Sequence, residues 1–79
     1  MLTILVVNGF RFFFYSNENN EPVHVHVEKG NGNGKIWLEP HVSIAYFFSF
    51  SPSAEKEIMV IVTAHAAAFK NKWYEYFGK

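Results

Sequence analysis

Cysteine is absent from this 79-residue sequence, and so is any excess of charge of one sign. Without cysteine, neither disulfides nor a thiolate metal site can stabilise the fold. Seven basic and seven acidic residues give a formal net charge of zero. The chain therefore lacks the overall positive charge that favours general nucleic-acid binding, but a local basic patch is not excluded. The opening segment, MLTILVVNGF, has neither the basic start of a signal peptide nor a long apolar run. We therefore expect a cytoplasmic domain without a membrane span.

Aromatic residues, by contrast, make up 19% of the chain, and nine of them are phenylalanines. A chain of this length predicts a single domain, residues 1–79, near the lower size limit for a self-sufficient core. So small a core cannot enclose every ring, and some rings should reach the surface or a subunit interface. A homodimer is the simplest arrangement that would cover them.

Residues 2–16 have the pattern of a β-hairpin. Asn8-Gly9 is a strong signal for a type I′ turn, because both central positions of that turn need a positive φ. The turn predicts three cross-strand pairs: Val7 with Phe10, Leu5 with Phe12, and Thr3 with Phe14. Both faces of this hairpin are largely apolar, so both should be covered, one by a helix and the other by a further segment or a second subunit.

Residues 23–39, VHVHVEKGNGNGKIWLE, predict a second hairpin in which Glu28 lies opposite Lys35. The valines then form an aliphatic face that turns toward the core, and the opposite face is polar. This register also predicts two further pairs: His26 with Trp37, and His24 with Glu39. The glycine-rich segment 30–34 lacks the GxGxxG spacing and a following helix, so we interpret it as a flexible hairpin loop and not as a phosphate-binding loop.

The remaining segments predict a fifth strand and a helix. Residues 42–50 alternate in the way that favours a strand, with a short helix as the alternative. Ser51 can cap a helix that has Pro52 in its first position, and Gly78 fits a C-terminal stop. The predicted fold is therefore α+β: a small antiparallel sheet of four or five strands, with two N-terminal hairpins, packed against one long C-terminal helix.

The polar face of the second hairpin is the candidate site. His24 and His26 lie two residues apart on one strand, so both imidazoles should project from the same half-exposed face. One could act as a general base and the other as a general acid. No cofactor is required, and a divalent metal bound by the same two histidines is an alternative. The residues expected to bind a ligand beside them are Arg11, Glu28, Lys35, Trp37 and Glu39.

The same arrangement has a purely structural interpretation, in which the two histidines are hydrogen-bonded on a solvated strand. Because their side chains are expected to point away from the core, replacing both with alanine should leave the fold intact.

The segments GFRFFFYSNE, EPVHVHVEKG and KIWLEP, followed by His65-x₇-Trp73-x₃-Phe77, resemble the DUF4160 family of small bacterial proteins. The resemblance covers nearly the whole chain in the same order. It departs at Val23, where family members usually carry a second proline, and at Ser49-Phe50, where they often have Gly-Phe. The resemblance implies a genomic neighbour from a second small family, DUF2442, and with it a toxin–antitoxin-like pair.

Together, the residues and the resemblance predict a small interaction domain that self-associates and binds a small partner protein. An RNase-like or metal-dependent enzyme centred on His24 and His26 is one alternative, and a nucleic-acid-binding regulator is another. An interaction domain needs a contiguous exposed apolar patch. An enzyme needs a concave pocket on which the two histidines and Glu39 converge.

Overall fold

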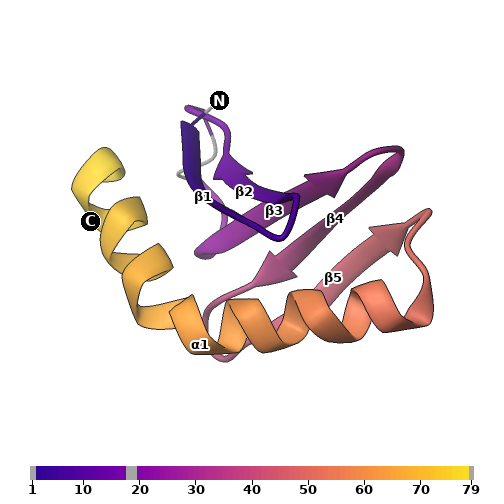
Figure 1. Ribbon diagram of the computed structural model, residues 1–79. Helices are drawn as coiled ribbons and strands as arrows, with labels where there is room; N and C mark the ends of the chain where they lie inside the picture. The colour runs from indigo at the N-terminus through magenta and orange to yellow at the C-terminus, as the bar shows by residue number, and fades with distance from the viewer. Residues whose placement is uncertain (1, 18–19, 79) are drawn as a thin grey trace.

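The computed structural model describes residues 2–17 and 20–78. Within these residues, the elements in chain order are β1 (Leu2–Val7), β2 (Phe10–Phe14), β3 (His24–Lys29), β4 (Gly32–Trp37), β5 (Ser43–Phe48) and α1 (Pro52–Phe77). The strands form one antiparallel sheet in the order β1-β2-β3-β4-β5, so β1 and β5 are its edges (Figure 1). The predicted α+β fold is confirmed, and residues 43–48 form a strand and not a helix.

The first hairpin contains the predicted turn. Asn8 and Gly9 have φ values of 52° and 83°, as a type I′ turn requires. Two of the predicted pairs, Val7 with Phe10 and Leu5 with Phe12, are confirmed, but the third is wrong. A β-bulge between Thr3 and Leu5 shifts the register, so that Leu2 and not Thr3 lies opposite Phe14.

The predicted register of the second hairpin is wrong by two residues. Lys29 lies opposite Gly32, which leaves a two-residue turn at Gly30-Asn31, and Glu28 therefore faces Asn33 instead of Lys35. Because the shift is an even number of residues, every side chain keeps the face that the sequence predicted for it. Its cross-strand partner changes, however.

Two glycines of β4 leave room for phenylalanine rings to pack directly on the strand. A Cβ atom on Gly34 would lie 2.5 Å from Cδ1 of Phe47, and one on Gly32 would collide with the ring of Phe50. The two phenylalanine rings therefore lie against bare backbone of β4. This packing holds the end of β5 and the start of α1 against the sheet.

The helix begins and ends where the sequence predicts. The backbone N–H of Ala54 donates to the Ser51 hydroxyl oxygen at 3.1 Å, and Pro52 occupies the first turn. Gly78 has φ 73°, and its N–H donates to the carbonyl oxygen of Tyr74 at 2.7 Å. No helix in the described part of the chain combines the length and the hydropathy that crossing a bilayer requires.

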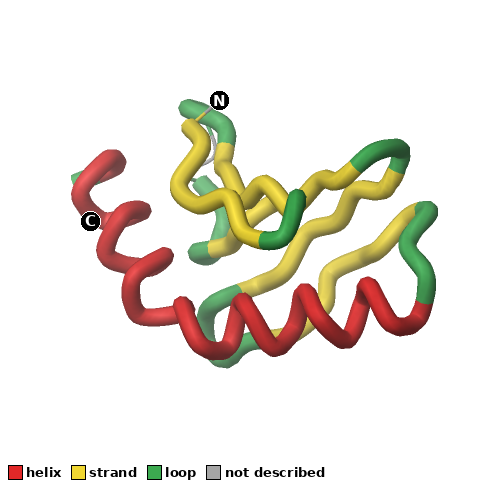
Figure 2. The backbone as a smooth tube through the Cα atoms, viewed as in Figure 1, coloured by secondary structure: helices red, strands yellow, loops and turns green. Residues whose placement is uncertain are grey.

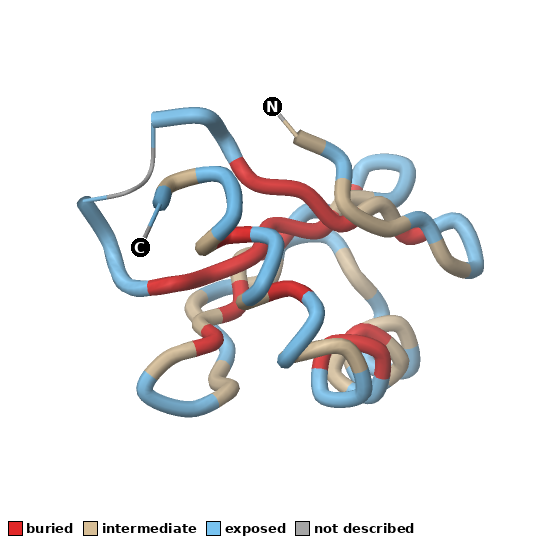
Figure 3. Tube along the Cα trace, turned by 90° about the vertical axis from the view of Figure 1, so that its left-hand side faces the viewer, coloured by how far each residue is buried: buried red, intermediate tan, exposed pale blue. Residues whose placement is uncertain are grey.

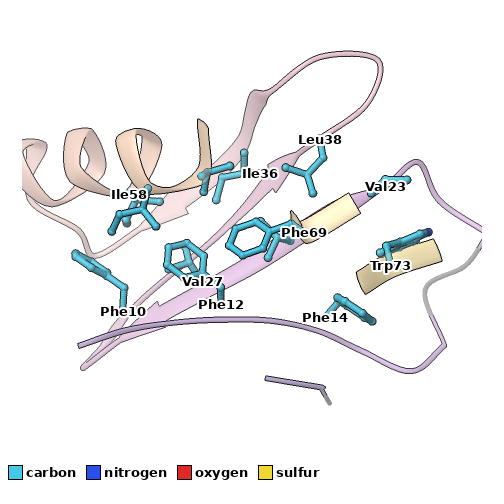
Figure 4. Packing of buried hydrophobic residues seen from close by; sticks show 13 residues of the cluster. Phe10, Phe12, Phe14, Val23, Val27, Ile36, Leu38, Ile58, Phe69 and Trp73 are labelled. Atoms are coloured by element: carbon cyan, nitrogen blue, oxygen red, sulfur yellow. The ribbon is translucent and has the colours of Figure 1, made fainter. Parts of the chain in front are cut away.

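Helix α1 packs against one face of the sheet and then turns past the strand ends (Figure 2). Its buried residues are Ile58, Ile61, Val62, Phe69 and Trp73. They meet a strand layer in which the predicted inward valines, Val23, Val25 and Val27, are buried with Phe10, Phe12, Phe14, Ile36 and Leu38 (Figure 4). Burial is concentrated in the central strands, and β5 alternates between half-buried and exposed residues (Figure 3).

We predict that Gly34→Ala destabilises the fold by about 1–3 kcal/mol, because the new Cβ would displace the Phe47 ring from its place on β4. Asn33→Ala is the matched control, since Asn33 is an exposed neighbour on the same strand, and we expect it to change stability by less than about 0.5 kcal/mol. Urea denaturation measures both variants. Equal transition midpoints for the two would show that the close approach is not needed.

Candidate functional site

The sheet face turned away from α1 carries the predicted site residues. We call this surface the histidine face and define it by Arg11, Phe13, His24, His26, Glu28, Lys35 and Trp37. Cross-strand pairing places Arg11 opposite Glu28, His26 between Phe13 and Lys35, and His24 opposite Trp37. The prediction that both imidazoles share one face is confirmed, and their ring centroids lie 5.1 Å apart.

The predicted half-exposure of the two histidines is wrong. His24 is 0% exposed and His26 is 8% exposed. The C-terminal part of α1 turns past the start of β3, which brings the Trp73 ring to 4.9 Å from the His24 ring. The Trp37 ring contacts another side of the His24 ring, and the two ring centroids are 5.5 Å apart. Nδ1 of His24 lies 2.9 Å from the carbonyl oxygen of Pro22. The sequence could not show that the helix end reaches this position.

His26 is enclosed by rings of its own face. The Phe13 ring stacks on it with centroids 5.5 Å apart and planes at 22°, and Tyr15 meets it edge-on at 4.9 Å. Stacked and edge-to-face rings at these separations stabilise one another beyond simple burial. The two imidazoles are thus members of an aromatic cluster that covers the middle of the face.

Two ion pairs flank this cluster. The Arg11 guanidinium contacts Glu28 through Nε, at 3.0 Å from Oε1, and also through Nη2. Its Nη1 donates to the hydroxyl of Thr3 at 2.8 Å, and its Cζ lies 4.4 Å from the centroid of Phe13. Arg11 therefore ties β1, β2 and β3 together across the sheet.

The second ion pair involves a residue that the sequence pattern did not indicate. Lys35 Nζ donates to the Glu21 carboxylate at 2.6 Å and lies 4.4 Å from the centroid of the Trp37 ring. The same carboxylate oxygen lies 3.8 Å from Nδ1 of His24. Glu21 precedes Pro22 in the loop before β3, and that adjacency was the only signal in the sequence that could have indicated it.

The predicted pairing of Glu39 with His24 is wrong, because His24 lies opposite Trp37. Glu39 follows the end of β4 and accepts a hydrogen bond from the hydroxyl of Tyr74 on α1. This hydrogen bond to Glu39 raises the pKa of Tyr74 above its ordinary value, and burial and the nearby negative charge act in the same direction. From the sequence, Tyr74 was expected only as part of the helix.

The arrangement of the histidine face favours stabilisation over chemistry. A buried imidazole can exchange a proton with a substrate only if the rings that cover it move. Among residues 2–17 and 20–78, no three His, Asp or Glu side chains come close enough together to hold a metal ion.

In the part of the chain that the structure describes, two surface hollows lie elsewhere. One, of about 440 Å³, separates β1 from the end of α1, and the other lies on the outer side of α1; neither is lined by His24, His26 or Glu39. The catalytic and metal-binding roles of the two histidines stay predictions.

The structure defines a class of small α+β domain, in which one bent helix covers one face of a five-stranded antiparallel sheet. The C-terminal part of the same helix also covers one end of the opposite sheet face. A family model described as a domain of unknown function (DUF4160) matches residues 9–74. This is most of the chain, and the chain therefore belongs to the DUF4160 family. No curated protein and no solved structure gives a significant match.

We predict that His24→Ala destabilises the protein by about 2–4 kcal/mol, because it opens a cavity between Trp37 and Trp73. This replaces the expectation from the sequence that both histidines can be removed without effect. His41→Ala is the control, because His41 is exposed, and it should cost less than about 0.5 kcal/mol. Chemical denaturation compares the two, and a small loss for His24→Ala would argue against a structural role for that ring.

A second prediction concerns alkaline pH. Because the folded protein holds Tyr74 protonated with a raised pKa, this group contributes stability that is present below about pH 10 and is lost as the pH rises through the folded pKa. We expect Tyr74→Phe to remove the component with the raised pKa from the tyrosinate absorbance. Glu39→Gln should lower the pKa of Tyr74. Tyr76→Phe should leave that component in place. An unchanged titration in Tyr74→Phe would contradict the assignment.

Proposed function

We propose that this chain is a small cytoplasmic interaction domain that self-associates and acts as one component of a toxin–antitoxin-like pair. The expected partner is a small neighbouring protein of the DUF2442 type, as the resemblance to DUF4160 proteins implies. The proposal rests on one observation, which is an apolar surface at an open edge of the sheet.

We call this the β5 edge surface and define it by Ile44, Tyr46 and Phe48. Their exposed fractions are 51%, 38% and 59%. Strand β5 pairs with β4 on one side only, so half of its backbone hydrogen-bonding groups point outward. Exposed large apolar side chains next to such an edge are typical of a surface that binds another chain.

The histidine face supports the two alternatives less well. The histidines on which an enzyme would depend are buried. The cations on which a nucleic-acid-binding regulator would depend, Arg11 and Lys35, are each held by a carboxylate, from Glu28 and Glu21. Phosphate contacts need cations that are free to displace counterions.

Expression with and without the genomic neighbour tests the proposal. We expect the chain alone to slow growth of a bacterial host, and co-expression of the DUF2442-type neighbour to restore growth and to yield a complex that co-purifies. Phe48→Lys should weaken self-association of the chain at least tenfold, because it places a charge on the β5 edge surface. Val60→Lys is the matched control, since Val60 is 64% exposed on α1. No growth effect together with no co-purification would contradict the proposal.

A further inference from the structure

We infer that the β5 edge surface binds β5 of a second copy of this chain, antiparallel and with Phe47 opposite Phe47, so that two five-stranded sheets join into one. The inference rests on the proposed function and specifies the occupant of its surface. Five features of the chain carry it.

The first feature is the absence of charged residues and of proline along β5. Natural edge strands are usually protected by charged side chains, by proline or by a cover of other structure. Residues 42–51 contain neither a charged residue nor a proline. The side chains of β5 therefore bring neither a charge nor a proline ring to its outward edge.

The second feature limits the register. Pairing with β4 is regular from Tyr46 to Phe48, which face Lys35, Gly34 and Asn33 in turn. The ladder shifts on one side of this segment, where Ala45 is left without a direct partner, and it ends on the other side at Ser49, which has φ 61°. A two-fold axis through the middle of the regular segment passes beside Phe47.

The third feature is the set of aromatic pairs that this register creates. Tyr46 lies opposite Phe48 of the second copy, and Phe48 lies opposite Tyr46 of that copy. Both side chains stand on the histidine-face side of the sheet, because they face Lys35 and Asn33. Their rings are already 5.2 Å apart within one chain, so pairing forms a cluster of four rings. Such cross-strand aromatic pairs stabilise antiparallel sheets.

The fourth feature is the position of two phenylalanine rings on the α1 side of the sheet. Phe47 and Phe50 lean inward over Gly34 and Gly32, because a Cβ atom on either glycine would collide with the ring that lies on it. Their rings therefore pack over β4 and away from the outer edge of β5.

The fifth feature is the charge around the surface. The formal net charge is zero, so two copies do not repel each other at long range. Lys35, the cation on the strand beside Tyr46, lies 2.6 Å from the Glu21 carboxylate. Bringing two copies together therefore adds no uncompensated positive charge to the joined sheet.

The other edge of the sheet fits this role less well. Among the large apolar side chains of β1, only Val6 is strongly exposed, at 60%, whereas Leu2, Ile4, Leu5 and Val7 pack against the core. Pairing of β1 with β5 of another copy would also be heterologous and would continue into an open polymer. Pairing of β5 with β5 closes at two copies.

The size of the surface sets the expected strength. With about 200 Å² for each complete side chain, the exposed parts of Ile44, Tyr46 and Phe48 amount to about 300 Å² per copy. A standard interface buries about 800 Å² per partner, so even with the paired backbone added this dimer is small. We expect a dissociation constant on the order of 10 µM.

Sedimentation of the full chain from about 1 to 500 µM, a range chosen around that affinity, tests the inference. The wild type should pass from monomer to dimer, Phe48→Lys should raise the dissociation constant at least tenfold, and Val60→Lys should leave it unchanged. Circular dichroism checks that both variants are folded. A wild type that stays monomeric throughout, a dimer that Phe48→Lys does not weaken, or a series of larger polymers would each overturn the inference.

A disulfide experiment tests the register without depending on Phe48→Lys. The chain has no cysteine of its own, so Tyr46→Cys and Phe48→Cys each carry a single thiol. When the two variants are mixed with tags of different size and oxidised, the mixed dimer should dominate, because only positions 46 and 48 lie directly opposite. Dominant homodimers, or no cross-link at all, would overturn the register.

These results separate the inference from the proposed function. If the wild type is monomeric but still forms the complex with its neighbour, the inference and the proposed self-association both fail, and the pairing with the neighbour stands. If the dimer forms in the stated register but the neighbour neither binds nor affects growth, the inference stands and the toxin–antitoxin-like pair fails.

Discussion

The two-residue turn at Gly30-Asn31 is the constraint on which the rest of the structure depends. It sets the pairing of β3 with β4 and so places Gly34 opposite Val27. With Gly34 at that position, the Phe47 ring can lie on the strand from the α1 side. The same register places His24 opposite Trp37, where Trp73 of the helix completes the enclosure. A slip by one residue would move every one of these side chains to the wrong face.

The histidine face shows how a small domain can cover a second sheet surface without a second helix. Phe13, Tyr15, the two imidazoles and Trp37 pack on one another, and the ion pairs of Arg11 and Lys35 lie along the border of this cluster. A polar pattern on a strand therefore serves here as part of the protein's own packing. The bend of α1 is essential to this arrangement, because it brings Trp73 from the core side to the start of β3.

The aromatic cluster of the histidine face ends before β5, so the large apolar side chains at this edge of the sheet stay exposed. Tyr46 and Phe48 continue the aromatic character of the histidine face to the sheet edge, but no described segment lies over them and their rings stay exposed. The two histidines to which the sequence first draws attention are buried in the protein's own packing, and the surface proposed for function lies at the β5 edge of the sheet.

Local chemistry determined much of this protein from the sequence alone. The Asn8-Gly9 turn, the cap at Ser51, the stop at Gly78 and the faces of the β3 valines and histidines all follow from φ preferences, hydrogen bonding of helix ends and the two-residue period of strands. The family resemblance was also readable in its motifs.

Only the tertiary structure decided which partner each of these side chains meets. The register of β3 with β4 depended on whether glycines 32 and 34 stay in a loop or accept rings from residues that are more than a dozen positions away. The burial of His24 depended on where a bend in α1 carries Trp73, and the exposure of Tyr46 and Phe48 depended on where the cover of the second face stops. Such contacts join residues distant along the chain, and no local preference specifies them.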